Sequence, residues 1–342
     1  MAAGSAGLVK QSPVVEIPVI DLAPYFDGSA KTRVADAVRD ACERIGFLVV
    51  TGHGVADSVV DALYRQALAF FDLPLDEKLR VQKPAGAVSK GYGAMGVKTV
   101  GKDRDPTLKP SLHESFAIGP PDLPDDPYYA DPAAISTFTP NLWPERPVGL
   151  RAAMTAYYRE MERLAAGILS IFATALDEPQ AYFAARIDRH ASILRTINYP
   201  ALTRVPEAGE QRSGAHTDTT AITILKTDDA PGGLQVRLPD GRWLDVPKIA
   251  SGFVVNIGDI LMRWTNDRFV STMHRVVNPP AEAGVQARRL SIPYFCMPNH
   301  DAVIECLPSC VGAGAKYPPI TSGRLLSDRY VTTYSIDRAA AA

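Results

Sequence analysis

The second half of the chain contains a series of short apolar runs, and this pattern constrains the fold more than any other sequence feature. The runs lie between Ser192 and Met297 and are separated by turn residues, such as the Pro-Asp-Gly at 239–241. They are rich in β-branched and aromatic residues and read SILRTINY, AITILK, GLQVRL, RWLDV, GFVVNI, ILMRW and RRLSIPYFCM. Short strands at this spacing predict an antiparallel sandwich or barrel.

The first half of the chain has a helical periodicity instead. Apolar residues recur every three or four positions within 31–45, 57–74 and 148–176, which predicts three helices. Two short apolar runs, at 14–20 and 47–51, predict strands, and the proline in the first favours an edge position for it.

Residues 84–147 are rich in Gly, Pro and Asp and predict a long irregular segment. Such a segment is too long for a simple connection and is typical of a lid or a binding loop. A disordered insertion is the alternative, which the aromatic residues of the segment disfavour. We therefore expect an α+β chain with a mainly β core and flanking helices. It forms one compact unit with four parts: an N-terminal region of helices and first strands at 1–120, a lid segment and long helix at 121–190, the core at 191–300 and a C-terminal segment and tail at 301–342.

The composition is that of a globular protein without a strong charge bias. The 342 residues carry a net charge of −2 and are 46% hydrophobic, so charge gives no reason to expect a nucleic-acid partner. No apolar run is long enough to cross a membrane, and the N-terminal residues do not resemble a secretory signal. We expect a cytoplasmic protein with free thiols, because no CxxC pair occurs among Cys42, Cys296, Cys306 and Cys310.

A histidine and an acid stand two residues apart at the start of an apolar run, in the stretch SGAHTDTTAITILKT. His216 and Asp218 form the only HxD or HxE pair in the sequence, and His274 follows Asp218 by 56 positions (274 − 218 = 56). Two histidines and one carboxylate on neighbouring strands can occupy one face of a metal ion and leave other positions open, an arrangement that suits Fe(II). The HxD pattern is also common by chance, and on its own it leaves an ordinary packed or surface histidine possible.

A second set of residues is suited to binding a carboxylate. Arg289 and Ser291 lie two positions apart on the predicted strand RRLSIPYF, so both face the same side. An arginine can bind a carboxylate through two parallel hydrogen bonds, and a nearby hydroxyl adds a third. Tyr199, at the end of ILRTINYP, could add a phenolic hydrogen bond. A surface arginine and a core tyrosine are the alternatives.

These motifs together resemble the isopenicillin N synthase-like superfamily of Fe(II)- and mostly 2-oxoglutarate-dependent oxygenases. The resemblance rests on the HTD…H…RxS pattern and on the long stretch VNIGDILMRWTNDRFVSTMHRVVNP around His274. It extends through the first half of the chain, at IPVIDL, DACERIGFLVVTGHGV, FFDLPLDEKL and HESFAIG. It therefore covers most of the sequence, from about Ile17 to Pro298.

The resemblance implies a double-stranded β-helix, or jelly roll, with flanking helices. It implies that the distal carboxylate of 2-oxoglutarate binds Arg289 and Ser291 with help from Tyr199, and that Fe(II) binds His216, Asp218 and His274. The implied reaction oxidises a small organic molecule with O2 and releases succinate and CO2, with ascorbate as a possible reductant. Hydroxylation is the default outcome, and desaturation or cyclisation are alternatives.

The sequence departs from the family near the expected pocket. Family members often read R-x-N-Y-Y-P where this chain has RTINYP, so Ile197 replaces the Asn and Asn198 replaces the first Tyr. His113 stands where the family's mid-chain KESF segment has Lys. These differences affect the prediction of the substrate and not the prediction of the iron ligands.

Substrate contacts are the least constrained prediction. Tyr92, Phe269 and Phe295 are candidates, although each aromatic ring also fits simple core packing. An acidic substrate could contact the basic residues of the irregular segment, which are otherwise solvated: Lys98, Lys102, Arg104 and Lys109.

Two other functions remain open at the level of the sequence. An iron oxidase that does not use 2-oxoglutarate, such as isopenicillin N synthase itself or the ascorbate-using ethylene-forming oxidase of plants, keeps the same Arg-x-Ser. A catalytically silent jelly-roll binding protein would keep the fold, but it would have no reason to retain all three metal ligands. The sequence makes no prediction of the oligomeric state.

Overall fold

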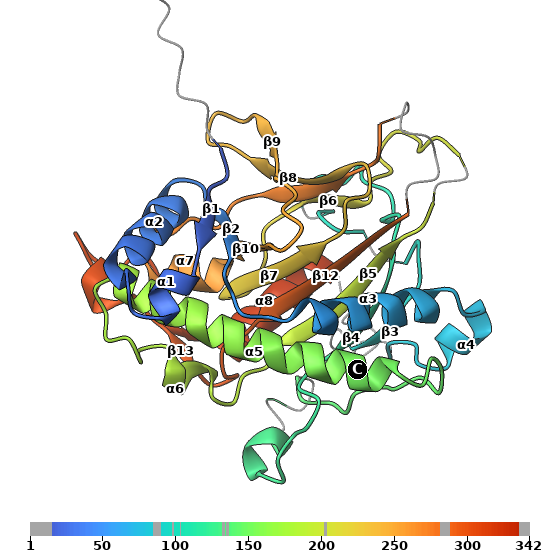
Figure 1. Cartoon of the computed structure of the whole chain (residues 1–342), viewed down its shortest axis with the longest axis horizontal. Coiled ribbons are helices and arrows are strands. Elements are labelled where there is room, and N and C mark those ends of the chain that lie inside the picture. Colours follow the sequence, from blue (N-terminus) through green and yellow to red (C-terminus); the bar gives the residue numbers. More distant parts are fainter. Residues whose placement is uncertain are drawn as a thin grey trace, which may run out of the picture.

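Two β-sheets face each other, and helices α3 (Asp57–Phe71) and α5 (Leu150–Ala175) lie across the outer face of the larger sheet (Figure 1). This arrangement confirms the predicted α+β jelly roll with flanking helices. The computed structural model describes residues 16–84, 90–97, 99–102, 104–131, 134, 137–201, 204–280 and 288–334.

The larger sheet combines strands from both halves of the chain. Its neighbours are antiparallel except for the first pair, which is parallel. In spatial order its strands are β1 (Val19–Asp21), β2 (Phe47–Thr51), β10 (Phe253–Ile257), β7 (Ile222–Thr227), β12 (Arg289–Cys296), β5 (Ile193–Tyr199), β4 (Glu114–Ile118) and β3 (Gly91–Gly93).

The smaller sheet is antiparallel and covers the other side of the jelly-roll interior. Its strands, in spatial order, are β6 (Ser213–His216), β11 (His274–Val277), β8 (Gly233–Arg237) and β9 (Trp243–Asp245). A separate two-stranded sheet joins β13 (Val303–Ile304) and β14 (Ile320–Thr321). The remaining helices are α1 (Ala23–Phe26), α2 (Lys31–Arg44), α4 (Leu75–Leu79), α6 (Ala184–Ile187), α7 (Asp259–Trp264) and α8 (Ser322–Tyr334), with 3-10 turns at Pro127–Ala130 and Pro308–Cys310.

The large sheet is covered on both faces, and its two faces differ in chemistry. Along β12, Leu290, Ile292 and Tyr294 belong to the apolar core beneath the helices. The alternate residues Arg289 and Ser291 therefore point into the space between the two sheets. This alternation separates a structural face from a face that can bind ligands.

The apolar core beneath the helices is organised by α5. Its buried side chains recur at helical spacing, and Tyr158 lies edge-on against Tyr294 of β12, with 5.2 Å between the ring centroids. A second, smaller core lies between the sheets and includes Phe47 of β2 and Val236 of β8. The first half of the chain thus contributes to both cores.

Several predicted elements are confirmed. Helices α2, α3 and α5 occupy the three segments of helical periodicity, and β2 and β1 are strands, with β1 at the edge of the large sheet. Gly46, between α2 and β2, has a left-handed backbone conformation (φ +65°). A Cβ atom added at Gly46 would lie 1.9 Å from the Val270 carbonyl oxygen. Only glycine fits that position without displacing the neighbouring backbone.

Two predictions of secondary structure are wrong. The apolar run ILMRW forms helix α7 and not a strand, because Gly258 ends β10 and the chain turns immediately into a helix. The segment 84–147 is not entirely irregular, because β3 and β4 within it extend the large sheet. None of the helices in the described part of the chain is long and apolar enough to cross a membrane.

Candidate metal and cosubstrate site

The three predicted metal ligands come together at one end of the smaller sheet. His216 ends β6 and His274 begins β11, and the two residues are directly paired across the strands, with 4.4 Å between their ring centroids. Asp218 follows β6 by two residues, and its carboxylate lies 3.7 Å from Nε2 of each histidine. One ligand atom from each residue lies within 4.8 Å of the others, which is close enough to share one ion.

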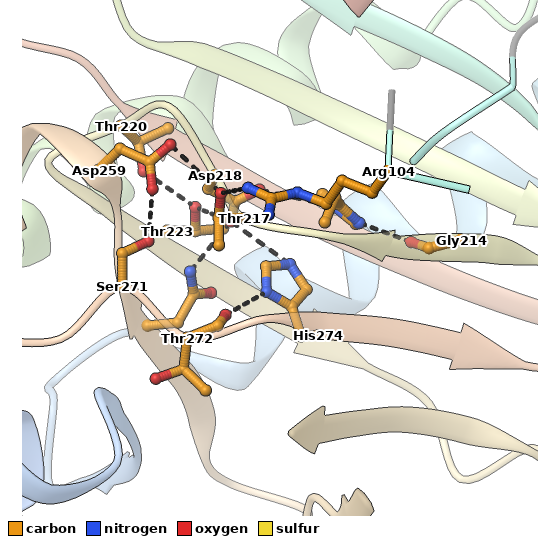
Figure 2. A network of polar contacts seen from close by, with 12 residues as sticks. Arg104, Gly214, Thr217, Asp218, Thr220, Thr223, Asp259, Ser271, Thr272 and His274 are labelled. Atoms are coloured by element: carbon orange, nitrogen blue, oxygen red, sulfur yellow. Dashed lines mark hydrogen bonds and ion pairs between the residues drawn. The ribbon is translucent and has the colours of Figure 1, made fainter. Parts of the chain in front are cut away.

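Backbone carbonyls orient both imidazole rings. Nδ1 of His216 lies 2.8 Å from the Gly214 oxygen, and Nδ1 of His274 lies 3.2 Å from the Thr272 oxygen (Figure 2). A carbonyl oxygen can only accept a hydrogen bond, so each Nδ1 must carry the proton. In the neutral form of each ring, Nε2 is therefore the atom without a proton and faces Asp218, which is the usual tautomer of a metal-binding histidine.

Protein donors fix the Asp218 carboxylate. Its Oδ2 accepts hydrogen bonds from Thr223 Oγ1 at 2.7 Å and from Asn256 Nδ2 at 3.0 Å. Burial alone would raise the pKa of Asp218, but His274, His216 and these two donors together hold that pKa below its ordinary value. The carboxylate is therefore held ionised, in the form that a metal requires.

A second carboxylate braces the chain segments that carry the ligands. Asp259, at the start of α7, accepts a hydrogen bond from Thr217 at 3.3 Å and one from Ser271 at 2.7 Å (Figure 2). Thr217 stands between His216 and Asp218, and Ser271 precedes His274 by three residues. Asp259 thus fixes the spacing between the HxD segment and the strand of the second histidine.

The predicted carboxylate-binding residues also converge. Arg289 of β12 is directly paired with Tyr199 of β5, and Ser291 lies two residues further along the interior face. All three are buried. Arg289 has an ionic contact of 3.8 Å with Asp228, but its buried Nε has no hydrogen-bond partner among the described residues. A bound carboxylate would satisfy this unused donor.

A cavity of about 390 Å³ opens beside Arg289 between the two sheets. Its lining includes Thr227 of β7, Leu234 of β8 and Val277 of β11. The lining is mixed, because apolar side chains such as Leu234 lie beside the cations Arg289 and Lys248 and the carboxylate of Asp245. The two cations suit a ligand that carries a carboxylate.

Three guanidinium groups surround Tyr199. Burial raises the pKa of Tyr199 to about 12, and the positive charges of Arg289, Arg212 and Arg195 oppose this rise. Sequence reasoning missed Arg212 and Arg195 as site residues. The alternation of β5 was the available signal for Arg195, because positions 195, 197 and 199 of one strand share a face.

Two of the three candidate substrate residues lie elsewhere. Tyr92 and Phe269 belong to the core on the helix side of the large sheet, where the Tyr92 hydroxyl donates to Glu114 and Phe269 packs against Phe172. This position corrects the expectation that they line the pocket, because both side chains are buried in that core, Tyr92 from β3 and Phe269 from the segment between α7 and β11. Phe295 does lie on the interior face of β12.

The basic residues of the irregular segment have separate positions. Arg104 reaches the HxD segment, with its guanidinium 3.3 Å from the Thr217 hydroxyl (Figure 2). Lys109 is paired with Glu207, Lys102 is exposed, and Lys98 lies outside the described residues. Among the described residues of this group, only Arg104 adjoins the candidate site.

Comparison with known proteins agrees with this geometry. Residues 17–146 match the family model of the N-terminal region of a non-haem dioxygenase in morphine synthesis, and residues 191–298 match that of the 2OG-Fe(II) oxygenase superfamily. The 2-oxoglutarate-Fe(II) type oxidoreductase hxnY of Emericella nidulans is 34% identical over 93% of this chain and 90% of its own length. Homoarginine-6-hydroxylase 2-ODD-233 of Oryza sativa is 31% identical over 93% of this chain and 97% of its own length.

A solved structure extends the similarity to three dimensions. A full-length protein of Neurospora crassa, in complex with alpha-KG and thymine, superposes with a TM-score of 0.82 at 32% identity and covers 93% of this chain and 97% of its own. Similarity of this extent shows the family and the cofactors. The chain therefore belongs to the 2OG-Fe(II) oxygenase superfamily and is a non-haem dioxygenase that uses Fe(II), 2-oxoglutarate and O2.

Proposed function

We propose that this dioxygenase hydroxylates a small organic molecule between its two sheets, next to an iron held by His216, Asp218 and His274. The observation that carries the proposal is the convergence of three ligand atoms within 4.8 Å, with both Nδ1 atoms engaged by carbonyls. Two histidines and one carboxylate on one face leave room for a chelating keto acid and for O2.

The distal carboxylate of 2-oxoglutarate binds Arg289 and Ser291, and the Tyr199 hydroxyl contributes a further hydrogen bond. The unused Nε of Arg289 supports this assignment, as does the cavity beside it. Bound iron and 2-oxoglutarate together supply the oxidation in which a C–H bond, O2 and the keto acid become an alcohol, succinate and CO2. The bound substrate displaces water from the space between the sheets, and the strands position the substrate carbon.

Relatives support a small substrate and hydroxylation. The Neurospora crassa structure is a complex with alpha-KG and thymine, and the rice relative is named for hydroxylation of homoarginine. Thymine and homoarginine are both small polar molecules, and neither identifies the substrate of this chain.

Measurement of succinate and CO2 against consumed O2 tests the proposal. The purified enzyme with Fe(II) and 2-oxoglutarate should release the two products in equal amounts, and a metabolite pool that contains the substrate should accelerate this release. A product that gains one oxygen atom from labelled O2 identifies hydroxylation. A product that has lost two hydrogen atoms and gained no oxygen would identify desaturation or cyclisation and contradict the proposed reaction.

A further inference from the structure

Phe295 and Arg195 lie on the interior face of the large sheet, near the candidate metal ligands. Phe295 of β12 is directly paired with Thr223 of β7, and Thr223 donates a hydrogen bond to Asp218. Arg195 of β5 is on the same face, and its guanidinium carbon lies 5.4 Å from the centroid of the Phe295 ring. Phe295 is therefore one strand away, and Arg195 two strands away, from a residue that holds a metal ligand.

Solvent reaches this part of the interior. Arg195, Ile197 and Phe295 all remain partly exposed, whereas the alternate residues Leu194 and Tyr294, which face the helices, are buried. Side chains that lie between two sheets and still retain exposed surface border open space. Phe295 lies near the end of β12 and Arg289 at its start, so a molecule bound at Phe295 lies at the other end of this strand from Arg289.

The Arg195 guanidinium has no counter-ion among the described residues. Its Nε is buried and without a hydrogen-bond partner, and none of the described carboxylates forms an ion pair with it. A buried charged donor that lacks a partner costs free energy, and a ligand that pairs with it recovers that cost. The unused Nε points to an anionic or strongly accepting ligand group.

The neighbouring acids are already committed. Asp218 faces the two histidines, and Asp228 lies 3.8 Å from Arg289 while its Oδ2 accepts a hydrogen bond from the Leu290 amide at 2.6 Å. In the proposed function, the distal carboxylate of 2-oxoglutarate compensates Arg289. Arg195 remains as the cation that the cosubstrate does not neutralise.

We infer that Arg195 and Phe295 form the substrate-recognition pair of this enzyme, and that its substrate is a small planar molecule that carries a carboxylate. The guanidinium fork binds the carboxylate in two parallel hydrogen bonds, and the face of Phe295 supports the planar part. This inference rests on the proposed function, because it places the substrate opposite the keto acid. Arg195 acts as a binding residue and takes no part in oxidation.

Binding of three simple probes to the full-length protein tests the inference. Benzoate is planar and anionic, benzamide is planar and neutral, and cyclohexanecarboxylate is anionic and not planar. Calorimetric titration of the anaerobic protein with Fe(II) and 2-oxoglutarate should show that benzoate binds at least about tenfold more tightly than benzamide, since a charge-assisted hydrogen-bonded pair contributes that much. Benzoate should also bind more tightly than cyclohexanecarboxylate, because only a planar ring can pack flat against Phe295.

Variants assign the preference to the two residues. Arg195→Gln should lower the affinity for benzoate about tenfold or more and leave the affinities for benzamide and 2-oxoglutarate unchanged. Phe295→Leu should reduce the preference for benzoate over cyclohexanecarboxylate. Arg288→Gln is the matched control, because Arg288 bonds to Asn198 and Asp72 on the other face of the sheet. If Arg195→Gln does not fold, Arg195→Lys tests the same point by keeping the charge and losing the fork.

The outcomes separate the inference from the function on which it rests. If the wild-type protein binds no 2-oxoglutarate and releases no succinate, the proposed function fails. The inference fails alone if succinate is released but benzoate binds the wild-type protein no better than benzamide does. It also fails alone if benzoate binds both Arg195 variants as tightly as it binds the wild type. A loss of 2-oxoglutarate affinity in Arg195→Gln, without a loss of benzoate affinity, would assign Arg195 to the cosubstrate and overturn the inference.

Discussion

Asp218 is the most constrained side chain of the site, because protein donors hold Oδ2 and Oδ1 faces His216. Asp218→Asn removes the negative charge with little change in volume, so we expect the fold to persist and Fe(II) affinity to fall more than about a hundredfold, with a parallel loss of turnover. Anaerobic metal titration and circular dichroism measure the two effects. Asp240→Asn, in an exposed turn, is the control, and an Asp218→Asn protein with full metal affinity would contradict the assignment.

Adjacent arginines provide a second test at the residue scale. Arg289 faces the interior and Arg288 the opposite side, where it bonds to Asp72. Arg289→Lys should raise the KM for 2-oxoglutarate about 10- to 100-fold, since an ammonium cannot replace the bidentate fork. Arg288→Lys should change this KM less than about twofold. Steady-state succinate release measures both, and equal effects would show that the carboxylate is not bound at Arg289.

How far the sequence predicts the site depends on whether its residues follow a pattern. The HxD pair and the spacing to His274 are local signals, and they predicted a set of ligand atoms that the fold does bring together. Asn256 and Asp259 support Asp218 and its neighbours, but no spacing rule connects them to it. The sequence shows only that Asn256 is a polar residue inside the apolar strand GFVVNI and that Asp259 follows this strand. Which residues they contact depends on how distant strands pair.

Helix α7 carries the brace between the two ligand-bearing segments. Asp259→Asn keeps one acceptor oxygen but loses the charge that Thr217 and Ser271 contact, so the two segments should be held less firmly. We expect metal affinity to fall about 10- to 100-fold, as is typical of groups that orient metal ligands. The pH dependence of turnover should stay unchanged. Calorimetric titration with Fe(II) or Mn(II) measures the change; unchanged affinity would show that Asp259 serves only the fold.

The loop between β2 and α3 is fastened by a neutral histidine. Nε2 of His53 lies 2.7 Å from the Ser251 carbonyl oxygen, and Nδ1 accepts the Val55 amide hydrogen at 3.1 Å. Protonation would place a second N–H against the Val55 amide. Burial is the largest cause that lowers the pKa of His53 below its ordinary value, with Lys226 adding to the effect.

This geometry predicts a pH dependence of stability. The unfolded chain takes up a proton near pH 6.5, the ordinary pKa of histidine, whereas folded His53 resists protonation until a lower pH. The free energy of unfolding should therefore fall as the pH drops below about 6.5, and His53→Gln should reduce this fall. Urea denaturation at pH 7.5 and 5.5, with a chelator present, measures it. If the free energy of unfolding falls equally between the two pH values in the wild type and in His53→Gln, His53 is not a cause of the pH dependence.

Elements were predicted well where one period extends over many residues and poorly where it does not. The 26-residue α5 repeats its buried face over several turns, so its periodicity is unambiguous. The run ILMRW is too short to distinguish a strand from a helix, and α7 forms because the chain turns at Gly258. Strands β6 and β11 escaped detection because the ligands and polar residues interrupt their apolar pattern.

At the scale of the whole molecule, the two regions that match family models contribute strands to the same large sheet. Residues 17–146 supply β1 and β2 at one side of the large sheet and β3 and β4 at the other. Phe47 of β2 also lies against His274, with 5.4 Å between the ring centroids. The N-terminal region therefore completes the sheet and one wall of the metal site.

A fragment that begins at Ala191 should not fold, although it contains the whole 2OG-Fe(II) oxygenase match. It would expose both edges of its remaining large sheet, at β10 and β5, and uncover the apolar face that α5 buries, including Leu194 and Tyr294. We expect this fragment to aggregate. The full chain should unfold in a single transition, with the same midpoint by circular dichroism and by fluorescence of the buried Trp264. A soluble fragment that unfolds cooperatively at that midpoint would show that residues 191–342 are an independent domain.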